Sequence, residues 1–468
     1  MTTLGNVIEA ERQRAGVPGC AVAVVADGKV MLLQGFGHRD LASQSPVTPD
    51  TLFPIGSATK TFTAALLASL AEACALDLDA PVRTYVDAFA LHDPVASEQV
   101  SMRDCLSHRT GLPRHDILWQ AGNGVLTRAD IVSALAHLPV NKPFRESYQY
   151  NNLLYIAAGE LAGGFSGSSW EEAIDHRMLR PLAMTRTNFC VGGTQADADH
   201  ATPYIRRANG DIEPTPFVDL GLAGPAGGIN SCARDLVPWL LALTGAHSPA
   251  LSTRTLTEMR TPAIAMPGDA DAPTTSQAYG LGLMLEDHHG RRIAHHGGNI
   301  DGFSSQILTR DDGVGIAVLT NLHATWLRDS LPYLILDTLD GVTSPDYGGY
   351  FRRRLEARFA AADAARALPA RSGLPPVRPL TDYAGRYRHP GYGELQVTHD
   401  GGSLAWHYRS LPSGPLRHCH LEVFEAHTHL NGVDVALPAQ FTHDLAGDVD
   451  AMHVQLELMV RPIRFARV

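Results

Sequence analysis

The sequence predicts an α+β protein in which an antiparallel sheet is flanked by helices, with an all-helical region, followed by a small all-β barrel. Three observations support this prediction. Apolar β-rich runs lie near both ends of the first 340 residues, Ala- and Leu-rich helical segments fill the region between them, and alternating runs separated by Gly and Pro make up the last part of the chain. We therefore divide the chain into a first domain over residues 1–340, a helical and Pro-rich linker over residues 341–377, and a β domain over residues 378–468.

The first domain is predicted to begin with a helix and a hairpin. Residues 4–14 have the pattern of a short amphipathic helix. The apolar runs Cys20 to Val25 and Lys29 to Gly35 are joined by Asp27-Gly28, which is a strong hairpin signal in that position. From Phe53 to Leu76 the chain becomes rich in Ala and Leu, as expected for a helix, and further helices and loops follow.

A second set of strands is predicted near the end of this domain. Gln306-Ile307-Leu308 and Val314 to Leu319 flank the turn Asp311-Asp312-Gly313. Strands at both ends with helices between them indicate one sheet that takes strands from both ends of the domain. A charged helix from Tyr350 to Ala367 then leads into Leu374-Pro375-Pro376, which is typical of a linker.

Composition excludes several classes of protein. The chain has 468 residues, of which 44% are hydrophobic and 19% charged, as in a folded protein. Lys and Arg total 38 against 49 for Asp and Glu, and no basic block occurs, so we expect neither a nucleic-acid nor a membrane partner. Residues 1–16 lack the apolar stretch of a signal peptide, and the six scattered cysteines form no Cys-x-x-Cys pair, so we expect a cytoplasmic protein with reduced thiols.

The first candidate for chemistry is Ser57-Ala58-Thr59-Lys60. It opens the Ala-rich helix, so Ser57 is expected near a helix N-terminus with Lys60 one turn further on the same face. A Ser hydroxyl is a weak nucleophile until a neighbour accepts its proton, and a desolvated Lys can do so because burial lowers its pKa. The pair therefore predicts nucleophilic catalysis.

Two further motifs complete the candidate site. Tyr150-Asn151-Asn152 precedes the apolar stretch Leu153 to Leu161, at the predicted start of a second helix. There Tyr150 can relay a proton and Asn152 can hydrogen-bond Lys60. His296-Gly297-Gly298-Asn299 follows a predicted strand. Its glycines, Gly297 and Gly298, would let a substrate lie against the strand, and the Asn299 N–H would join the Ser57 N–H in an oxyanion hole. We expect the preceding His295 to face outward.

In this order, the three motifs resemble those of the serine β-lactamase and penicillin-binding-protein family, in its class C-like branch of esterases, D-aminopeptidases and acyltransferases. Ser107 to Asp116, Leu222 to Ile229 and Gly302 to Ser305 also resemble blocks of this branch, and the resemblance covers about residues 5–340. The tail, with Tyr383 to Tyr387 and Tyr392-Gly393, is similar to the lipocalin-like domain often appended to these enzymes. The resemblance implies a β-lactamase/transpeptidase-like fold followed by a lipocalin-like barrel.

The resemblance also implies roles for the candidate residues, without a cofactor. Ser57 would be the acylated nucleophile, Lys60 and Tyr150 the acid/base pair, Asn152 a positioning amide and His296 the third-motif residue. True β-lactamases and DD-peptidases carry Lys at that last position, where it helps to bind a substrate carboxylate. Because His is neutral much of the time at pH 7, the sequence disfavours efficient β-lactam hydrolysis and favours an ester, amide or thioester donor.

Two other classes of protein fit the sequence less well. His418-Cys419-His420 and His427-Thr428-His429 each place two imidazoles on one face of a predicted strand, which is a metal-ligand spacing. No acidic cluster joins them, so no metal is predicted. A non-catalytic binding protein on this scaffold would be expected to lack Ser57, Lys60 or Tyr150, and all three are present.

Within the enzyme class two hypotheses stay open. One is a hydrolase that acts on a small peptide-like substrate, either a D-stereospecific peptidase or amidase or a broad carboxylesterase. The other resembles a stand-alone penicillin-binding-protein-type thioesterase, which takes a nonribosomal peptide from a carrier protein and cyclises it. The two differ in whether water or an amine attacks the acyl-enzyme, and the sequence does not distinguish them.

Overall fold

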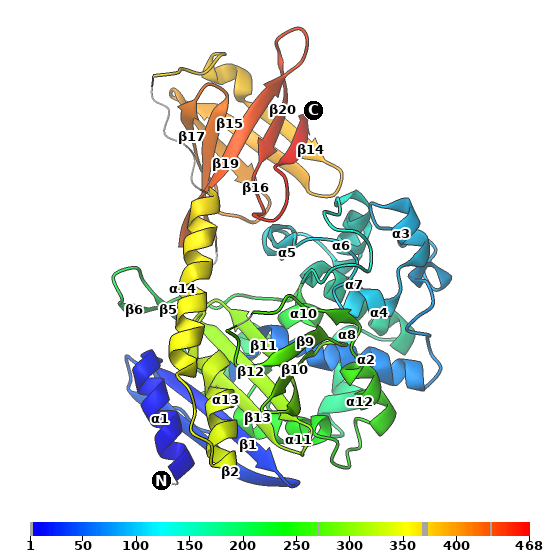
Figure 1. Cartoon of the computed structure of the whole chain (residues 1–468). Helices are drawn as coiled ribbons and strands as arrows, with labels where there is room; N and C mark the ends of the chain where they lie inside the picture. The colour runs from blue at the N-terminus through cyan, green and yellow to red at the C-terminus, as the bar shows by residue number, and fades with distance from the viewer. Residues whose placement is uncertain (1–2, 270, 367–372, 431–432) are drawn as a thin grey trace.

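The computed structural model describes residues 3–269, 271–366, 373–430 and 433–468. In the described residues, nine strands form a sheet in the order β3-β2-β1-β13-β12-β11-β10-β9-β8, and every pair in it is antiparallel (Figure 1). Because β1 pairs with β13, the sheet joins the two ends of the domain, as the sequence predicts. The strands are β1 (Gly19–Ala26), β2 (Lys29–Asp40), β3 (Ser45–Pro46), β8 (Ile264–Ala265), β9 (Thr275–Tyr279), β10 (Met284–His288), β11 (Arg291–Ile300), β12 (Phe303–Arg310) and β13 (Gly315–Thr320).

Helices cover both faces of the sheet. Along β1 the side chains alternate: Val22 and Val24 belong to the apolar cluster beneath α1 and α13, whereas Ala21 and Ala23 belong to the cluster that includes α2 and α11. The four helices are α1 (Thr3–Ala15), α13 (Leu327–Asp340), α2 (Lys60–Glu72) and α11 (Ala233–Leu243). The expected N-terminal helix and both expected hairpins are present.

The expected outward position of His295 is wrong. Its side chain is buried, with Nδ1 2.8 Å from Gln306 Nε2 and Nε2 3.4 Å from a Glu286 carboxylate oxygen. The next residue of β11, His296, points to the opposite face and is buried as well. Because helices cover both faces of the sheet, a side chain on either face of this strand is shielded from solvent.

The helical region lies beside the sheet on the α2 side (Figure 1). The remaining short elements include two small strand pairs, β4 with β7 and β5 with β6. The helices and strands are η2 (Val82–Thr84), α3 (Pro94–Gln99), α4 (Met102–Leu106), α5 (Asp116–Gly122), α6 (Arg128–Ala134), η3 (Leu135–His137), α7 (Asn152–Ser166), α8 (Trp170–Ile174), η4 (Asp175–Leu179), α9 (Val191–Ala196), α10 (Gly224–Gly227), α12 (Thr253–Arg260), β4 (Phe53–Pro54), β5 (Tyr204–Arg206), β6 (Ile212–Pro214) and β7 (Asn230–Ser231).

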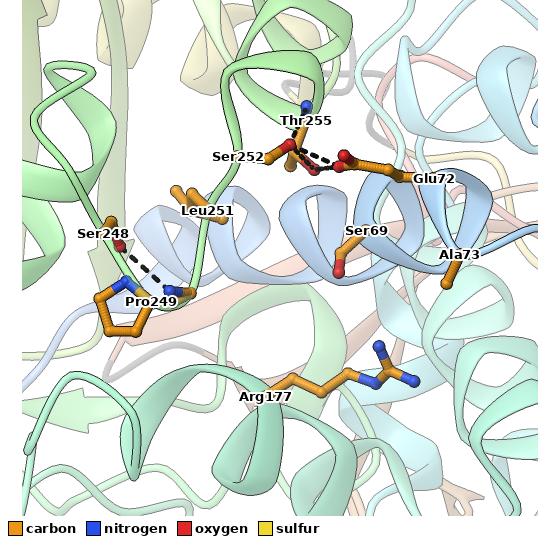
Figure 2. A pocket seen from close by; sticks show the side chains of 10 residues that line it. Ser69, Glu72, Ala73, Arg177, Ser248, Pro249, Leu251, Ser252 and Thr255 are labelled. Atoms are coloured by element: carbon orange, nitrogen blue, oxygen red, sulfur yellow. Dashed lines mark hydrogen bonds between the residues drawn. The ribbon is translucent and has the colours of Figure 1, made fainter.

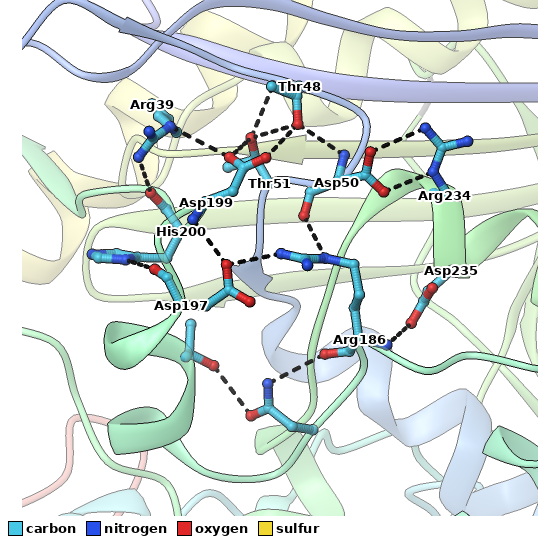
Figure 3. A network of polar contacts seen from close by, with 12 residues as sticks. Arg39, Thr48, Asp50, Thr51, Arg186, Asp197, Asp199, His200, Arg234 and Asp235 are labelled. Carbon is cyan, nitrogen blue, oxygen red and sulfur yellow. Dashed lines mark hydrogen bonds and ion pairs between the residues drawn. The ribbon is translucent and has the colours of Figure 1, made fainter.

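The segment expected to be helical from Phe53 starts as a strand instead. Phe53 and Pro54 pair with β7, a 3₁₀ turn η1 (Gly56–Thr59) follows, and α2 begins only at Lys60. A polar network fixes the chain just before β4 (Figure 3). In it Asp50 pairs with Arg234 of α11, and Thr51 Oγ1 donates to Asp199 Oδ1 at 2.6 Å. The turn that carries Ser57 is therefore approached by an anchored segment.

The long helix α14 (Tyr347–Arg366) leads from the sheet to the second domain (Figure 1). Residues 367–372 of the expected linker, including the expected helix end at Ala367, lie outside the described residues. Among the described residues eight strands close into a barrel, because β14 pairs with β21. After η5 (Leu380–Tyr383) they are β14 (Gly385–His389), β15 (Gly393–Asp400), β16 (Ser403–Tyr408), β17 (Gly414–His420), β18 (Val423–Leu430), β19 (Val433–His443), β20 (Val449–Val454) and β21 (Ile463–Arg467).

Of the two histidine pairs of the barrel, only His427 and His429 on β18 keep the expected strand alternation, with the buried Thr428 between them. A bulge interrupts β17 between His418 and His420, and it leaves His418 exposed and His420 buried. On β18, His429 Nδ1 lies 3.0 Å from an Asp434 carboxylate oxygen.

None of the helices in the described ranges combines the length and apolar character needed to cross a membrane.

Candidate active site

The 3₁₀ turn η1 brings Ser57 beside the first residue of α2. Lys60 is fully buried, and its Nζ lies 3.2 Å from Ser57 Oγ. Gly56, just before Ser57, has a left-handed φ of +51°, and a Cβ there would meet the Asn299 nitrogen at 2.9 Å. Both the conformation and the close approach require glycine, so this turn is built to bring Ser57 against β11.

The surroundings of Lys60 favour its uncharged amine. Nζ lies 2.7 Å from Asn152 Oδ1 and 2.7 Å from the Ala226 carbonyl oxygen, and both atoms can only accept hydrogen bonds. Burial, and next the charge of Arg114, hold the pKa of Lys60 well below its ordinary value, against the opposing charge of Asp116. A neutral amine spends its two N–H bonds on those acceptors, and its lone pair is left for the Ser57 hydroxyl.

Tyr150 completes the contacts of Ser57. The side chains of Ser57 and Tyr150 are hydrogen-bonded, and the Tyr150 ring centre lies 4.8 Å from Lys60 Nζ. Burial raises the pKa of Tyr150 to about 12, although the bond from Ser57 and the charge of Arg114 oppose this. At neutral pH the phenol therefore keeps its proton, which suits a proton donor or relay, while Lys60 is the better proton acceptor.

Asn152 is the first residue of α7, as the sequence predicts, and its amide has a fixed orientation. Its Nδ2 donates to Asp116 Oδ1 at 2.9 Å, so its Oδ1 is the atom that faces Lys60. Asp116 also accepts from Trp119 Nε1 at 3.0 Å and from Arg114 Nε at 2.7 Å. Burial alone would raise the pKa of Asp116, but Arg114 and these hydrogen bonds lower it, so the carboxylate stays charged.

His296 occupies a different kind of position. Its Nδ1 lies 2.8 Å from the Gly297 carbonyl oxygen and its Nε2 3.0 Å from the Tyr279 hydroxyl. Burial, followed by the charge of Lys60, holds the pKa of His296 well below its ordinary value. Both ring nitrogens thus bond to the protein, and the ring packs 6.2 Å from Tyr150. The His296 ring is therefore positioned to hold the Tyr150 ring and the Gly297 backbone in place.

His108 supports the same region and was not singled out by the sequence analysis. Its φ is +59°, and its Nδ1 accepts a hydrogen bond from the Asn151 backbone N–H at 3.1 Å. Its ring centre lies 4.4 Å from that of Tyr150. The segment Ser107 to Asp116, quoted above only for its resemblance, therefore supplies His108, Arg114 and Asp116 to the site.

The glycines of the third motif permit a close backbone approach. A Cβ at Gly298 would lie 1.8 Å from the Ile55 carbonyl oxygen, and one at Gly297 would lie 2.5 Å from Gln306 Oε1. Asn299 is locked by its side chain, whose Oδ1 accepts from Ser304 Oγ at 2.8 Å. The backbone nitrogen of Asn299 consequently lies next to the turn of Ser57, where an oxyanion hole would need it.

The charges of two arginines act on Tyr150, and a third arginine, from α14, interacts with both of them. Arg114 lies 5.1 Å from the Tyr150 ring centre, and the charges of Arg114 and Arg328 both act on the Tyr150 phenol. Arg358, an exposed residue of α14, belongs to the same group, because loss of surrounding water and then the charges of Arg114 and Arg328 lower its pKa. Asp329 opposes that effect. The arginine cluster leaves a cationic edge near Tyr150.

A surface hollow of about 350 Å³ lies elsewhere, between α2, η4 and α12 (Figure 2). It is lined mainly by polar residues, among them Ser69, Glu72 and Arg177. Glu72 already accepts hydrogen bonds from Ser252 and Thr255. The hollow shares no residue with the Ser57 site.

Comparison with known proteins identifies the family of the chain. A family model described as Beta-lactamase matches residues 4–340, and a Domain of unknown function (DUF3471) matches residues 369–467. The chain is 29% identical over 481 residues to "Unguisins hydrolase ungD" of Aspergillus violaceofuscus, covering 92% of this chain and 83% of that protein. The octameric penicillin-binding protein homologue from Pyrococcus abyssi shares the fold, with a TM-score of 0.67, 24% identity and 99% of each chain covered.

The D-amino acid amidase from Ochrobactrum anthropi SV3 is also similar, with a TM-score of 0.60 and 25% identity, over 73% of this chain and 99% of that one. The family match covers more than two thirds of the chain and includes the nine-stranded sheet, the helices around it and the turn of Ser57. The chain is accordingly a member of the β-lactamase and penicillin-binding-protein family, a serine hydrolase whose catalytic domain is followed by a closed β-barrel.

Proposed function

We propose that this enzyme cleaves an amide or ester bond of a peptide-like substrate through an acyl-enzyme on Ser57, with a D-residue on the acyl side. The observation that carries the proposal is the buried Lys60 amine, 3.2 Å from Ser57 Oγ and hydrogen-bonded so that its lone pair is left for the Ser57 hydroxyl. This is the arrangement that activates a Ser nucleophile without a His base.

Acylation begins when the Ser57 oxygen attacks the substrate carbonyl and its proton passes to Lys60. The negative charge that develops on the carbonyl oxygen is stabilised by the backbone N–H groups of Ser57 and Asn299. Tyr150 donates its proton to the leaving amine or alkoxide and is reprotonated by Lys60. A water molecule then repeats the sequence in reverse, and the acid product and the free enzyme result.

The proposed substrate class rests on two findings. The similar proteins include a D-amino acid amidase and a hydrolase of unguisins, by their names. His296, in place of the Lys of β-lactamases, has both nitrogens bonded within the protein and offers no cation to a carboxylate. These findings favour an amide or ester donor over a β-lactam.

The test compares two epimers of one activated peptidyl ester, with a small apolar residue at the scissile carbonyl. The D-epimer should give the higher kcat/KM by roughly 1 to 3 kcal/mol, because exchange of hydrogen and side chain drives one of them into the wall of Tyr150 and Asn152. Intact-mass spectrometry should show an acyl adduct on the wild type and none on Ser57→Ala.

An adduct that persists in Ser57→Ala would disprove the assignment of the nucleophile. Equal rates for the two epimers would leave a broad esterase. Chromatography of the products identifies the acyl acceptor: free acid means that water resolves the acyl-enzyme, and a cyclic product from a peptidyl thioester would instead establish the thioesterase hypothesis.

A further inference from the structure

A second cluster of polar side chains lies on the other side of the sheet from Ser57, where the turn after β10 meets α13. It consists of His288, His289 and Asp337. His288 and Asp337 are almost fully buried, whereas the His289 side chain is 46% exposed. Each residue offers one ligand atom, and these three atoms lie within 4.8 Å of one another.

The hydrogen bonds of His288 define which of its nitrogens is available. Nδ1 lies 3.1 Å from the carbonyl oxygen of Pro273, which can only accept, so Nδ1 carries a proton. Nε2 lies 3.0 Å from Asp337 Oδ1. In the neutral ring, the Nε2 lone pair would therefore face a carboxylate oxygen. This contact is favourable only with a second proton or a metal ion between the two atoms.

His289 and Asp337 have a matching arrangement. His289 Nε2 lies 3.2 Å from the same Asp337 Oδ1, and the second carboxylate oxygen, Oδ2, accepts a hydrogen bond from the Tyr347 hydroxyl at 2.8 Å. Metal-bound histidines usually donate their other N–H to a carbonyl or carboxylate, and metal-bound carboxylates are themselves hydrogen-bonded. Pro273 and Tyr347 occupy those outer positions here.

We propose that His288 Nε2, His289 Nε2 and Asp337 Oδ1 bind a divalent transition-metal ion, for which zinc is the best match. Two imidazoles and one carboxylate are common zinc ligands, and the observed separations of 3.0 and 3.2 Å are close to the roughly 3.3 Å edge of a tetrahedron with zinc–ligand bonds of 2.0–2.1 Å. The exposed side of His289 leaves the fourth position to water.

The ion would act structurally. It would join the β10–β11 turn to α13 and, through the Tyr347 hydroxyl, to the first residue of α14, the helix that leads to the barrel. Because zinc would bind the folded chain and not the unfolded one, it should raise the melting temperature of the protein.

The experiment uses the full-length enzyme without a histidine tag, treated with chelator and titrated with Zn²⁺ in a calorimeter. We expect one equivalent to bind. His289→Ala, a change at an exposed side chain, should weaken binding roughly 100-fold or more and abolish the zinc-dependent rise in melting temperature. The control is His92→Ala, another exposed histidine, which should bind as the wild type does.

Two further measurements separate this site from other histidines. Co²⁺ should give the visible absorption of tetrahedral coordination in the wild type and in His92→Ala but not in His289→Ala. Tyr347→Phe should weaken zinc binding roughly tenfold, since it removes the bond that orients Asp337. If the wild type binds no zinc, or if His289→Ala binds it undiminished, the proposal fails and the cluster is a buried ion pair between His288 and Asp337.

Discussion

Lys60 combines complete burial with hydrogen bonds to oxygen atoms that can only accept from it. An ammonium group could fill all of these positions, including Ser57, but it would then offer no lone pair to the Ser57 proton. Burial shifts the balance toward the neutral amine. In the proposed mechanism this neutral nitrogen accepts the Ser57 proton.

Lys60→Arg should consequently be almost as inactive as Lys60→Ala. The guanidinium keeps the charge and part of the hydrogen bonding but does not accept a proton, so kcat/KM should fall roughly a hundredfold or more in both variants. Steady-state kinetics with an activated ester measures this, and thermal melting checks that each variant is folded. Near-normal kcat/KM in a folded Arg variant would show that Lys60 serves only as a structural cation.

The pH dependence of activity should report the two charges beside Lys60. The active form has the neutral amine. The value of kcat/KM is therefore high at pH values above the pKa of Lys60 and falls as the pH drops below that pKa. Arg114 lowers that pKa and Asp116 raises it. Arg114→Gln should therefore move the acidic limb of the kcat/KM profile to higher pH, and Asp116→Asn should move it to lower pH, each by roughly one unit.

Loss of packing alone would not move the acidic limbs of the two variants in opposite directions. Opposite shifts would therefore report the two charges specifically. Arg353→Gln, a change at an exposed residue of α14, serves as the charge control and should leave the limb in place. Shifts of the same sign in the two active-site variants would contradict the assignment of the limb to Lys60.

Helix α14 does more than join two domains. Its Arg358 stands in the cationic cluster with Arg114 and Arg328, although it is more than two hundred residues from Arg114 along the chain. Arg358 is an exposed residue, but its guanidinium has lost part of its surrounding water, and nearby positive charges oppose its own. A substrate group of negative charge at this edge would relieve the repulsion.

We expect Arg358→Ala to reduce kcat/KM for peptides that carry a free carboxylate beyond the scissile bond by roughly three- to tenfold, with little effect on the corresponding amides. Arg352→Ala removes an exposed arginine from the same helix and is the matched control. The ratio of kcat/KM for acid and amide substrates is the quantity to compare. An unchanged ratio in Arg358→Ala would mean that this side chain does not meet the substrate.

For the whole molecule, the barrel is in direct contact with the helix that holds Asp116. The Tyr392 hydroxyl lies 2.7 Å from His115 Nδ1, and Glu457 accepts a hydrogen bond from the Ile117 backbone N–H at 2.6 Å. Ser410 donates its backbone N–H to the Ala121 carbonyl oxygen at 3.1 Å. The barrel loops that carry these three residues therefore contact α5, which lies below the barrel in Figure 1. Through these contacts the second domain holds a helix of the candidate site in place.

Glu457→Ala should therefore lower kcat/KM roughly tenfold, because the start of α5 loses a partner and Asp116 no longer holds Asn152 as firmly. Glu394→Ala removes a barrel carboxylate that pairs with Arg388 on the surface, and it should have little effect. Kinetics of both variants, with melting curves to confirm folding, decides the matter. Equal activity in the two variants would limit the barrel to another role.

The sequence by itself was sufficient for the features that depend on neighbouring residues. Asp27-Gly28 and Asp311-Asp312-Gly313 form the predicted hairpins, since such turns fix the pairing of the strands on either side. Ser57 and Lys60 face each other because they are one turn apart. Asn152 begins α7 as expected, with Asn151 as its N-cap. The barrel followed from the alternation of its strands.

Only the tertiary structure decided the contacts between distant segments. His295 is buried because helices cover both faces of its strand, which strand alternation cannot show. Asp116 orients Asn152, and Arg358 joins the cationic edge, because loops and α14 return to Ser57 from far along the chain. The cluster of His288 and Asp337 likewise exists only once α13 packs on the sheet. Local patterns specify elements, whereas the charge and burial of a side chain depend on everything that packs around it.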